Sequence, residues 1–408
     1  MRAERSGPRV LIYSHDTFGL GHLRRCRTIA HALVEQHRDL SVLILSGSPI
    51  IGSFDFRARV DFVRIPGVIK LRNGEYTALN LHIDIDETLS MRSSIIRHTA
   101  EIFDPDIFIV DKEPLGLRGE VQETLELLKR RGCRLVLGLR DVMDEPAQLA
   151  PEWQRKNVMP SLRELYDQIW VYGLPQICDP MEGIDLSRSI RDKIIYTGYL
   201  PRKVPPAPLD QRADPVPRAP YVLVTTGGGG DGEALIDWVL RAYETDHLLP
   251  YPALLVLGPF MQSERQSEFM ALVARLKRVK AITFDAHLER LMANSVGVVA
   301  MGGYNTFCEI LSFDKRAIIV PRTVPRLEQW IRASRAQELG LTRMVEDNHG
   351  YDPAVMAAAL RGLPKQRKPS EVVVPGLLEG LVNVNRLVAP WLQRPVEEPA
   401  SATIHRLG

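Results

Sequence analysis

The sequence predicts an α/β protein of two domains, each built on a parallel sheet, and three observations support this. The chain has 408 residues, more than one hydrophobic core usually serves. Short aliphatic runs alternate with amphipathic stretches through both halves, which is typical of parallel strands covered by helices on both faces. Between the two series, the segment 201–220 contains seven prolines, so it can continue neither a helix nor a strand ladder.

We therefore expect a first domain over 1–200, a linker over 201–220 and a second domain over 221–370. A final helix and tail over 371–408 are free to return to the first domain. The expected strands are Val10–Ser14, Ser41–Ser46, Asp106–Val110, Arg134–Leu139, Gln168–Tyr172 and Lys193–Tyr196, then Tyr221–Thr225, Ala253–Leu257, Ala281–Phe284, Gly297–Ala300 and Ala317–Val320. The clearest helices are His22–Gln36, Gly119–Arg130, residues 232–243, and Leu377–Ala389, which Pro390 should end.

Composition narrows the function classes. The 52 basic residues against 50 acidic ones give a net charge of +2, which disfavours a general nucleic-acid binder. The four cysteines form no CxxC pair, so we expect neither a zinc site nor a disulfide framework. No apolar run approaches the ~20 residues that span a bilayer, and MRAERSGP lacks a signal-peptide core. We expect a cytoplasmic protein, for which contact with the inner face of the membrane stays open.

A first glycine-rich junction, SHDTFGLGHLRR, follows the first expected strand. Gly19 and Gly21 permit a sharp turn, and His22 begins a helix at the crevice where parallel strands end. The alternative is a helix-capping turn with an exposed histidine. The segment is no dinucleotide fingerprint, because the third glycine of GxGxxG is missing.

A second junction, TTGGGGD, lies between a strand and a helix in the second half. Gly227, Gly228 and Gly229 would let a diphosphate approach the backbone and the helix N-terminus. The alternative is a flexible surface loop. No GK[ST] follows, so this is no ATP-hydrolysing P-loop.

A third junction, MGGYNTFCE, contains Gly303, Asn305 and Thr306 at another helix start. Glu309, one turn further on, could accept both hydroxyls of a ribose, or it could simply be a charge stabilised near a helix N-terminus. Glu328 and Gln329 follow the next strand on the same crevice side.

Three charged residues end strands of the first half: Asp111, Arg140 and Asp141. They belong at the crevice if the sheet is parallel, and otherwise act as caps or surface ion pairs. The only candidate metal motif, DIDE at 84–87, is better explained as a solvated acidic turn. We expect no metal and no cofactor.

These motifs resemble the family 28 glycosyltransferases of the GT-B architecture, two Rossmann-like domains facing across a cleft, above all the peptidoglycan N-acetylglucosaminyltransferases. The resemblance covers most of 9–350 and is strongest over 281–340, in FDAHLERLMANSVGVVAMGGYNTFCEIL, IIVPR and EQWIRASRAQELG. The family commonly has two glutamines where this chain has Glu328 and Gln329, and its N-terminal loop contains more glycine.

The resemblance implies roles for the donor side. The loop Phe284, Asp285 and His287 would contact the nucleobase, and Gly227–Gly229 with Gly303–Thr306 would hold the diphosphate. Glu309 would bind the ribose, and Glu328 and Gln329 the donor sugar.

The segment GLGHLRRCRTIAHAL also resembles the GxGHxxRC segment of the UDP-sugar hydrolase of pseudaminic acid synthesis. The leading hypothesis is inverting, metal-independent transfer from a UDP-sugar-type donor to an acceptor hydroxyl in glycan, cell-envelope or secondary-metabolite biosynthesis. His22 would be the base, Asp111 would orient or replace it, and Arg140 and Asp141 would line the acceptor side. Nucleotide-sugar hydrolysis, a non-catalytic nucleotide-sugar sensor and a sugar-nucleotide epimerase are the alternatives.

Overall fold

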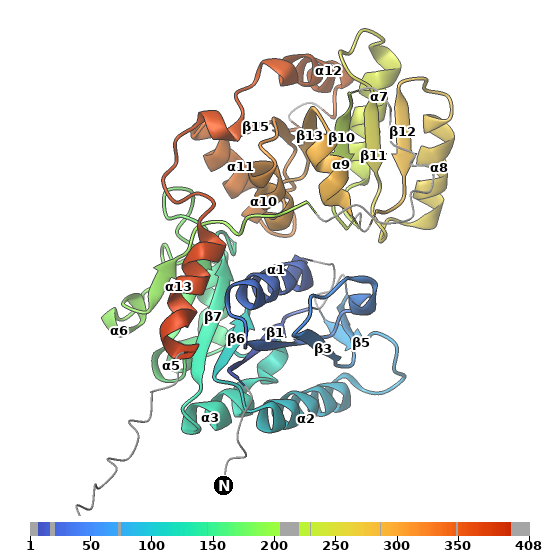
Figure 1. Cartoon of the computed structure of the whole chain (residues 1–408). Helices are drawn as coiled ribbons and strands as arrows, with labels where there is room; N and C mark the ends of the chain where they lie inside the picture. Colours follow the sequence, from blue (N-terminus) through green and yellow to red (C-terminus); the bar gives the residue numbers. More distant parts are fainter. Residues whose placement is uncertain are drawn as a thin grey trace, which may run out of the picture.

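The computed structural model describes residues 7–16, 21–71, 75–144, 146–204, 220–228, 230–285, 287–347 and 350–392. Two α/β domains are stacked one above the other, with the first domain below in Figure 1. Gly19, Gly229, most of the expected linker and the tail from 393 onward lie outside the described residues. The expected α/β fold with parallel sheets is confirmed.

The first domain contains a seven-stranded sheet in the order β3-β2-β1-β6-β7-β8-β9. Its strands are β1 (Arg9–Ser14), β2 (Ser41–Ser46), β3 (Val60–Arg64), β6 (Ile107–Asp111), β7 (Arg134–Arg140), β8 (Gln168–Tyr172) and β9 (Ile194–Tyr196). The helices are α1 (Gly21–Gln36), α2 (Ile85–Phe103), α3 (Gln122–Arg130), α4 (Pro146–Arg155), α5 (Val158–Glu164) and α6 (Arg188–Arg191). Every strand pair in this sheet is parallel, so their carboxyl ends meet at one edge, facing the second domain.

The second domain contains a six-stranded parallel sheet in the order β12-β11-β10-β13-β14-β15. Its strands are β10 (Val222–Thr225), β11 (Ala253–Val256), β12 (Val279–Ile282), β13 (Gly297–Ala300), β14 (Ala317–Ile319) and β15 (Arg343–Met344). The helices are α7 (Glu233–Thr245), α8 (Ser263–Val273), α9 (Leu288–Asn294), α10 (Tyr304–Ser312), α11 (Glu328–Glu338) and α12 (Pro353–Gly362).

Each sheet is covered on both faces, as its continuous apolar strands require. In the first domain α1 packs on one face, while α2 and α3 lie on the other, as Figure 1 shows. In the second domain α7 and α12 pack together on one face, and α9, α10 and α11 cover the other.

The last helix, α13 (Gly380–Leu392), packs on the first domain although it follows the second in the chain. Val384 and Val388 are fully buried in the same core as the α1 residues. Trp391 stacks on Trp170 with ring centroids 6.5 Å apart. The prediction that Pro390 ends this helix was wrong: the proline lies inside the last turn, where its missing N–H removes only one helical bond.

Several other details differ from the sequence prediction. Helix α3 begins at Gln122, not Gly119, because Arg118 and Gly119 have left-handed φ values of 48° and 88°. Strand β12 begins at Val279, which pairs with Ala253, so the strand ends before Phe284. The acidic turn at 84–87 is the start of the unpredicted helix α2, whose N-cap Asp84 accepts a hydrogen bond from the Asp86 amide.

Candidate active site

A cavity of about 490 Å³ lies between the two domains at the carboxyl ends of their strands. Parallel strands of both sheets point toward it, so the residues that follow them converge there. Of the residues singled out from the sequence, the following line it: Gly21, His22, Arg140, Gly227, Gly228, Phe284, Asp285, Gly303, Asn305, Thr306, Glu328 and Gln329. Asp111, Asp141, His287 and Glu309 do not belong to its wall.

His22, in the first turn of α1, is held by Asp111 at the end of β6. Its Nδ1 lies 2.5 Å from the Asp111 carboxylate. Arg25, one turn further along α1, donates two hydrogen bonds to the same carboxylate, of 2.8 and 2.7 Å. A carboxylate only accepts, so Nδ1 of His22 carries the proton, which leaves Nε2 as the imidazole atom able to accept one.

Burial controls the charge of this pair. Burial lowers the pKa of His22 to about 4, although the charge of Asp111 acts in the opposite direction. Burial by itself would raise the pKa of Asp111, but the charges and hydrogen bonds of Arg25 and His22 together outweigh it and hold that pKa well below its ordinary value. At neutral pH the arrangement is therefore a carboxylate beside a neutral imidazole, the state in which a histidine can act as a base.

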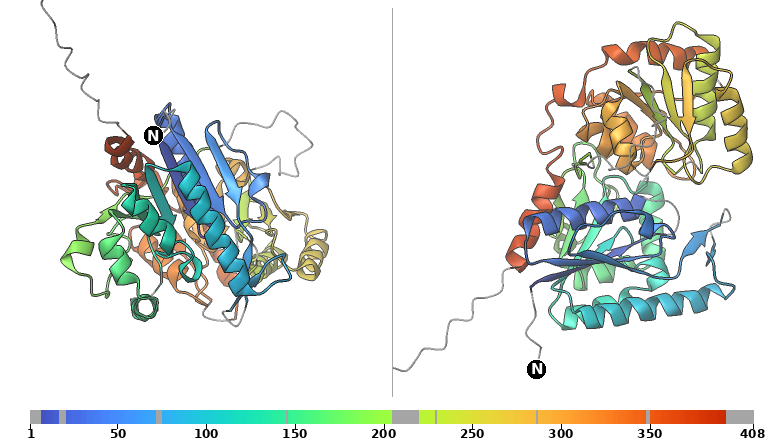
Figure 2. Two further views of the ribbon diagram at one scale, coloured as in Figure 1. Left: turned by 90° about the horizontal axis from the view of Figure 1, so that it is seen from below. Right: turned by 45° about the vertical axis from the view of Figure 1, so that its right-hand side comes forward.

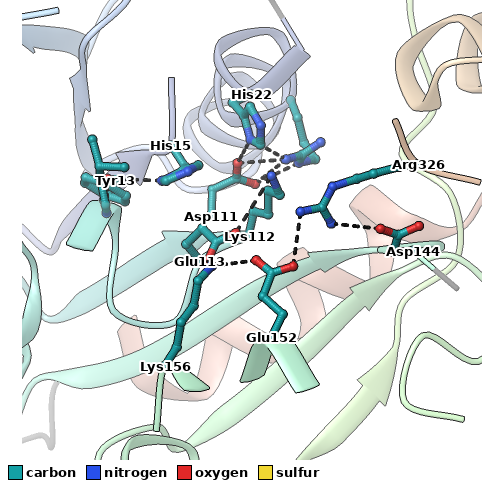
Figure 3. Close-up of polar contacts among 12 residues, drawn as sticks. Tyr13, His15, His22, Asp111, Lys112, Glu113, Asp144, Glu152, Lys156 and Arg326 are labelled. Atoms are coloured by element: carbon teal, nitrogen blue, oxygen red, sulfur yellow. Dashed lines mark hydrogen bonds and ion pairs between the residues drawn. The ribbon is translucent and has the colours of Figure 1, made fainter. Parts of the chain in front are cut away.

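His15, which sequence reasoning missed, lies beside this pair (Figure 3). Its buried ring stands edge-on to that of His22, with centroids 5.7 Å apart. Its Nδ1 lies 3.3 Å from the Tyr13 hydroxyl. The only signal in the sequence is its place directly after β1, one residue beyond the strand.

The glycine turns of the second domain form the opposite wall. Gly227 has a left-handed φ of 69°, which a glycine adopts without strain. A Cβ at Gly228 would lie 3.2 Å from the Phe260 ring. Gly303 is the N-cap residue of α10, and the free N–H groups of that helix start suit an anion.

Asn305 forms hydrogen bonds between the two domains. Its side-chain amide donates to the Gly21 carbonyl at 3.0 Å, and its Oδ1 accepts from Arg202 at 2.6 Å. The cap of α10 and the start of α1 are thus fixed to each other.

Glu309 is fully buried and pairs with Arg24 of the first domain. Arg24 also bonds Glu289 of α9, at 2.6 Å. The second Glu309 oxygen, Oε2, is buried and has no hydrogen-bond partner among the residues that the structure describes. Sequence reasoning identified Glu309 but missed Arg24, because 285 positions separate the two.

The pair Glu328 and Gln329 begins α11 and lies at the cavity. Arg322 donates to Glu328 at 2.7 Å and also bonds Asp231. The Arg322 amide donates to the Gln329 side chain at 3.2 Å. These contacts fix both side chains before any ligand binds.

The expected base-contacting loop has an exposed Phe284 ring at the cavity, with 43% of its surface free. The Asp285 carboxylate accepts from the His287 amide at 2.6 Å. His287 itself precedes α9 and lies away from the cavity wall.

Arg140 and Asp141 were expected together on the acceptor side, and the structure separates them. Arg140 lines the cavity. Asp141 is fully buried and receives two hydrogen bonds of 2.6 Å from Arg332 of α11 and one of 2.7 Å from Tyr199. The expectation that Asp141 lines the cavity was wrong, because its carboxylate forms an ion pair with an arginine of the second domain.

Among the described residues, no His, Cys, Asp and Glu side chains gather in threes as a metal site would require. Across that same part of the chain, none of the helices has the length and apolar character needed to cross a bilayer.

Comparison with known proteins finds similarity to glycosyltransferases. Residues 222–368 match the glycosyltransferase family 28 C-terminal domain. An uncharacterized glycosyltransferase of Methanosarcina mazei is 23% identical over 369 residues, covering 86% of this chain and 88% of the relative. A second, from Methanosarcina acetivorans, is 24% identical over 364 residues, with 84% and 86% covered.

Three solved structures share the fold. Phytolacca americana UGT2, complexed with UDP-2-fluoroglucose and pterostilbene, superposes with a TM-score of 0.59 at 12% identity, over 93% of this chain and 94% of that one. The glycosyltransferase VinC in complex with dTDP gives 0.54 at 17%, with the same shares. MurG of Acinetobacter baumannii gives 0.52 at 12%, over 93% and 95%. With a family 28 C-terminal domain on this two-domain fold, the chain is a glycosyltransferase of the GT-B type.

Proposed function

We propose that this enzyme transfers a sugar, with inversion and without a metal ion, from a UDP-sugar to an acceptor hydroxyl that His22 deprotonates. The observation that carries the proposal is the His22–Asp111 pair at the cavity wall, across from the glycine turns of the second domain. A base on one domain faces an anion-binding helix start on the other, and the anomeric carbon would lie between them.

The reaction follows from these positions. Nε2 of His22 takes the proton of the acceptor hydroxyl as its oxygen attacks the anomeric carbon. The bond between that carbon and the diphosphate oxygen breaks, and its electron pair leaves with the nucleoside diphosphate. The imidazolium that forms is stabilised by the Asp111 carboxylate 2.5 Å away.

The leaving diphosphate needs stabilisation of its negative charge. The turn at Gly227 and Gly228 and the start of α10 at Gly303 and Thr306 present backbone N–H groups of a kind that binds phosphate. We infer that these groups do the work that a metal ion does in other transferases.

We assign the nucleoside and sugar contacts to the second domain. Phe284 would contact the base, Glu309 the ribose, and Glu328 and Gln329 the sugar hydroxyls. The solved neighbours that carry UDP-2-fluoroglucose and dTDP support a pyrimidine nucleotide.

The test is a donor panel followed by turnover. Isothermal titration with UDP-, TDP- and GDP-sugars identifies the donor, and we expect a UDP-sugar to bind most tightly. Liquid chromatography with mass detection then follows nucleoside diphosphate release with and without pooled acceptor sugars. Release that depends on an acceptor supports transfer, and steady release in buffer alone would instead establish hydrolysis, the chemistry of the GxGH relative. Tight donor binding with neither activity would make the protein a sensor.

A further inference from the structure

One arginine in the cavity wall has no hydrogen-bonded carboxylate among the residues that the structure describes. Four arginines line the cavity: Arg24, Arg25, Arg140 and Arg322. Three of them pair with a carboxylate, Arg24 with Glu309, Arg25 with Asp111 and Arg322 with Glu328. The guanidinium of Arg140 forms no hydrogen bond or ion pair with any residue that the structure describes, and its Nε is buried with no acceptor.

The Arg140 side chain is partly buried, and the charge of Glu328 attracts it, but no carboxylate in the part of the chain that the structure describes forms a hydrogen bond with its guanidinium. A guanidinium that loses water without gaining such a hydrogen bond is unfavourable for folding. The sequence supplies a carboxylate directly after it, in Asp141, yet that group is bound to Arg332 and Tyr199. A cation without a hydrogen-bonded carboxylate at a cavity is a candidate binding group, to which the ligand supplies the opposite charge.

A second cation lies next to it. Lys112 follows Asp111 at the end of β6, and its amide donates to the Gly138 carbonyl of β7 at 2.7 Å, so the two strand ends are adjacent. Its ammonium lies behind the cavity wall and, among the described residues, has one ion pair, with Glu113 at the long distance of 3.8 Å. In Figure 3 Lys112 lies between the His22–Asp111 pair and Arg326.

Glu328 is the carboxylate whose charge acts most strongly on Arg140, but it is hydrogen-bonded to Arg322 at 2.7 Å, and the carboxylates around Lys112 are likewise shared with other cations. Glu113 is shared with Lys156 at 2.8 Å. Glu152 is shared between Lys156 and Arg326, and Asp144 also pairs with Arg326 at 3.4 Å. Burial, with Arg140, Arg326 and Lys156 nearby, lowers the pKa of Lys112 to about 8. An anion brought to this place would relieve the repulsion.

We propose that Arg140, assisted by Lys112, binds an anionic group of the acceptor, a phosphate or carboxylate next to the hydroxyl that His22 deprotonates. This rests on the transfer function proposed above. The donor diphosphate is assigned to the glycine turns of the second domain, whereas Arg140 and Lys112 end strands of the first. A guanidinium fork suits either anion, since both offer two oxygens in its plane.

Saturation-transfer NMR tests the site with glucose, glucose 6-phosphate and glucuronate, each added to enzyme saturated with UDP. UDP fills the diphosphate pocket, so an anion that still binds occupies a separate place. We expect the two anionic sugars to bind at least about tenfold more tightly than glucose. Arg140→Gln should remove that preference, and Arg140→Lys should keep part of it. Arg188→Gln, on an exposed arginine, is the matched control.

Each other outcome overturns the proposal. Loss of the anionic signals on adding UDP would assign Arg140 to the donor diphosphate. Equal binding of glucose and its charged analogues would show that no acceptor anion binds there. An Arg140→Gln variant that keeps the full preference for the anionic sugars would show the same. UDP binding is recorded first: if UDP fails to bind, the proposed donor is wrong, while the same titrations without nucleotide still decide the role of Arg140.

Stability provides a second readout, independent of ligand. Replacing this partly buried cation, which has no hydrogen-bonded carboxylate, by a neutral side chain of similar length should raise the melting temperature, as for binding residues held at the expense of stability. Without ligand, Arg140→Met should therefore have a higher melting temperature than wild type. Glucose 6-phosphate should raise the melting temperature of wild type more than that of the variant. A large fall in the melting temperature of Arg140→Met would make Arg140 a structural residue.

Discussion

Arg332 of the second domain holds Asp141 of the first in two hydrogen bonds, each 2.6 Å long, with both side chains almost completely buried. The third nitrogen of the Arg332 guanidinium, Nη1, donates to the Gly302 carbonyl at 2.9 Å. The turn that precedes α10 is thereby joined to the end of β7, next to Arg140. An ion pair in this position fixes how the two halves of the cavity face each other.

Breaking that pair from one side should be strongly destabilising. Arg332→Met leaves the Asp141 carboxylate buried with only Tyr199 as a partner, and we expect a loss of about 3–5 kcal/mol in the free energy of unfolding. Urea titration measures it. The double variant Asp141→Leu, Arg332→Met removes both charges and should recover much of the loss. A single variant as stable as wild type would show that the pair contributes nothing.

His22→Ala should reduce turnover by about 10²–10⁴ while donor affinity stays nearly unchanged, because the donor is assigned to the other domain. Steady-state kinetics and isothermal titration measure the two quantities. His98→Ala, on an exposed histidine of α2, is the control. Full activity in the His22 variant would remove it from the mechanism. Asp111 would not replace it directly, since its carboxylate is already bound by Arg25 and lies away from the cavity wall.

The pH profile follows from the low pKa of His22. The ordinary pKa of 6.5 falls to about 4 in the protein, so the imidazole stays neutral from pH 8 down to about 5. We expect kcat/KM to change little across that range and to decline below it as the base becomes protonated. A decline centred near pH 6.5 would mean that the working base is a histidine exposed to solvent.

Glu309→Ala should weaken nucleotide-sugar binding by about 1.5–3 kcal/mol, the worth of hydrogen bonds to a charged group. The Oε2 of Glu309 has no hydrogen-bond partner among the described residues, but the side chain lies behind the cavity wall, so a ribose hydroxyl reaches this oxygen only if Arg24 moves away. Titration of UDP separates this effect from contacts to the sugar, and Glu289→Ala, which removes the other Arg24 partner, is the matched control. Unchanged UDP affinity with an intact fold would leave Glu309 as the ion-pair partner of Arg24 alone.

Arg24 joins the domains by bonding both Glu289 and Glu309. Arg24→Met removes these contacts, so the unliganded protein should be less compact than wild type, and UDP-sugar should compact both. Small-angle scattering measures the radius of gyration of each form. Equal radii for wild type and variant, with and without ligand, would show that closure does not depend on Arg24.

Local pattern was enough to predict the sheets. Aliphatic runs such as SVLILS at 41–46 form strands with the expected bounds, because a strand buried on both faces needs apolar residues at every position. The junction glycines and His22 were found for a related reason: in a parallel sheet, residues directly after strands gather at one edge. Strand β3 was missed because VDFVR mixes charges into an edge strand.

The partners of the site residues could not be predicted. Asp141 and Arg332 lie 191 positions apart, and Arg24 and Glu309 lie 285 apart. Nothing in a local pattern states which strand-end carboxylate will be neutralised by the other domain and which arginine will be left alone. That depends on how the two finished domains meet, so Asp141 was placed at the acceptor side while Arg24 was not considered.

The return of α13 makes the second domain an insertion within the first. The α1 face of the first sheet is completed by Val384 and Val388, which the ribosome adds only after the whole second domain has been made. During synthesis, part of the core of the first domain therefore stays exposed to solvent while the second domain, of about 150 residues, is made and folds. The order of folding can thus be reversed relative to the order of the chain: the second domain can finish first, and the first domain, which carries His22, is completed last.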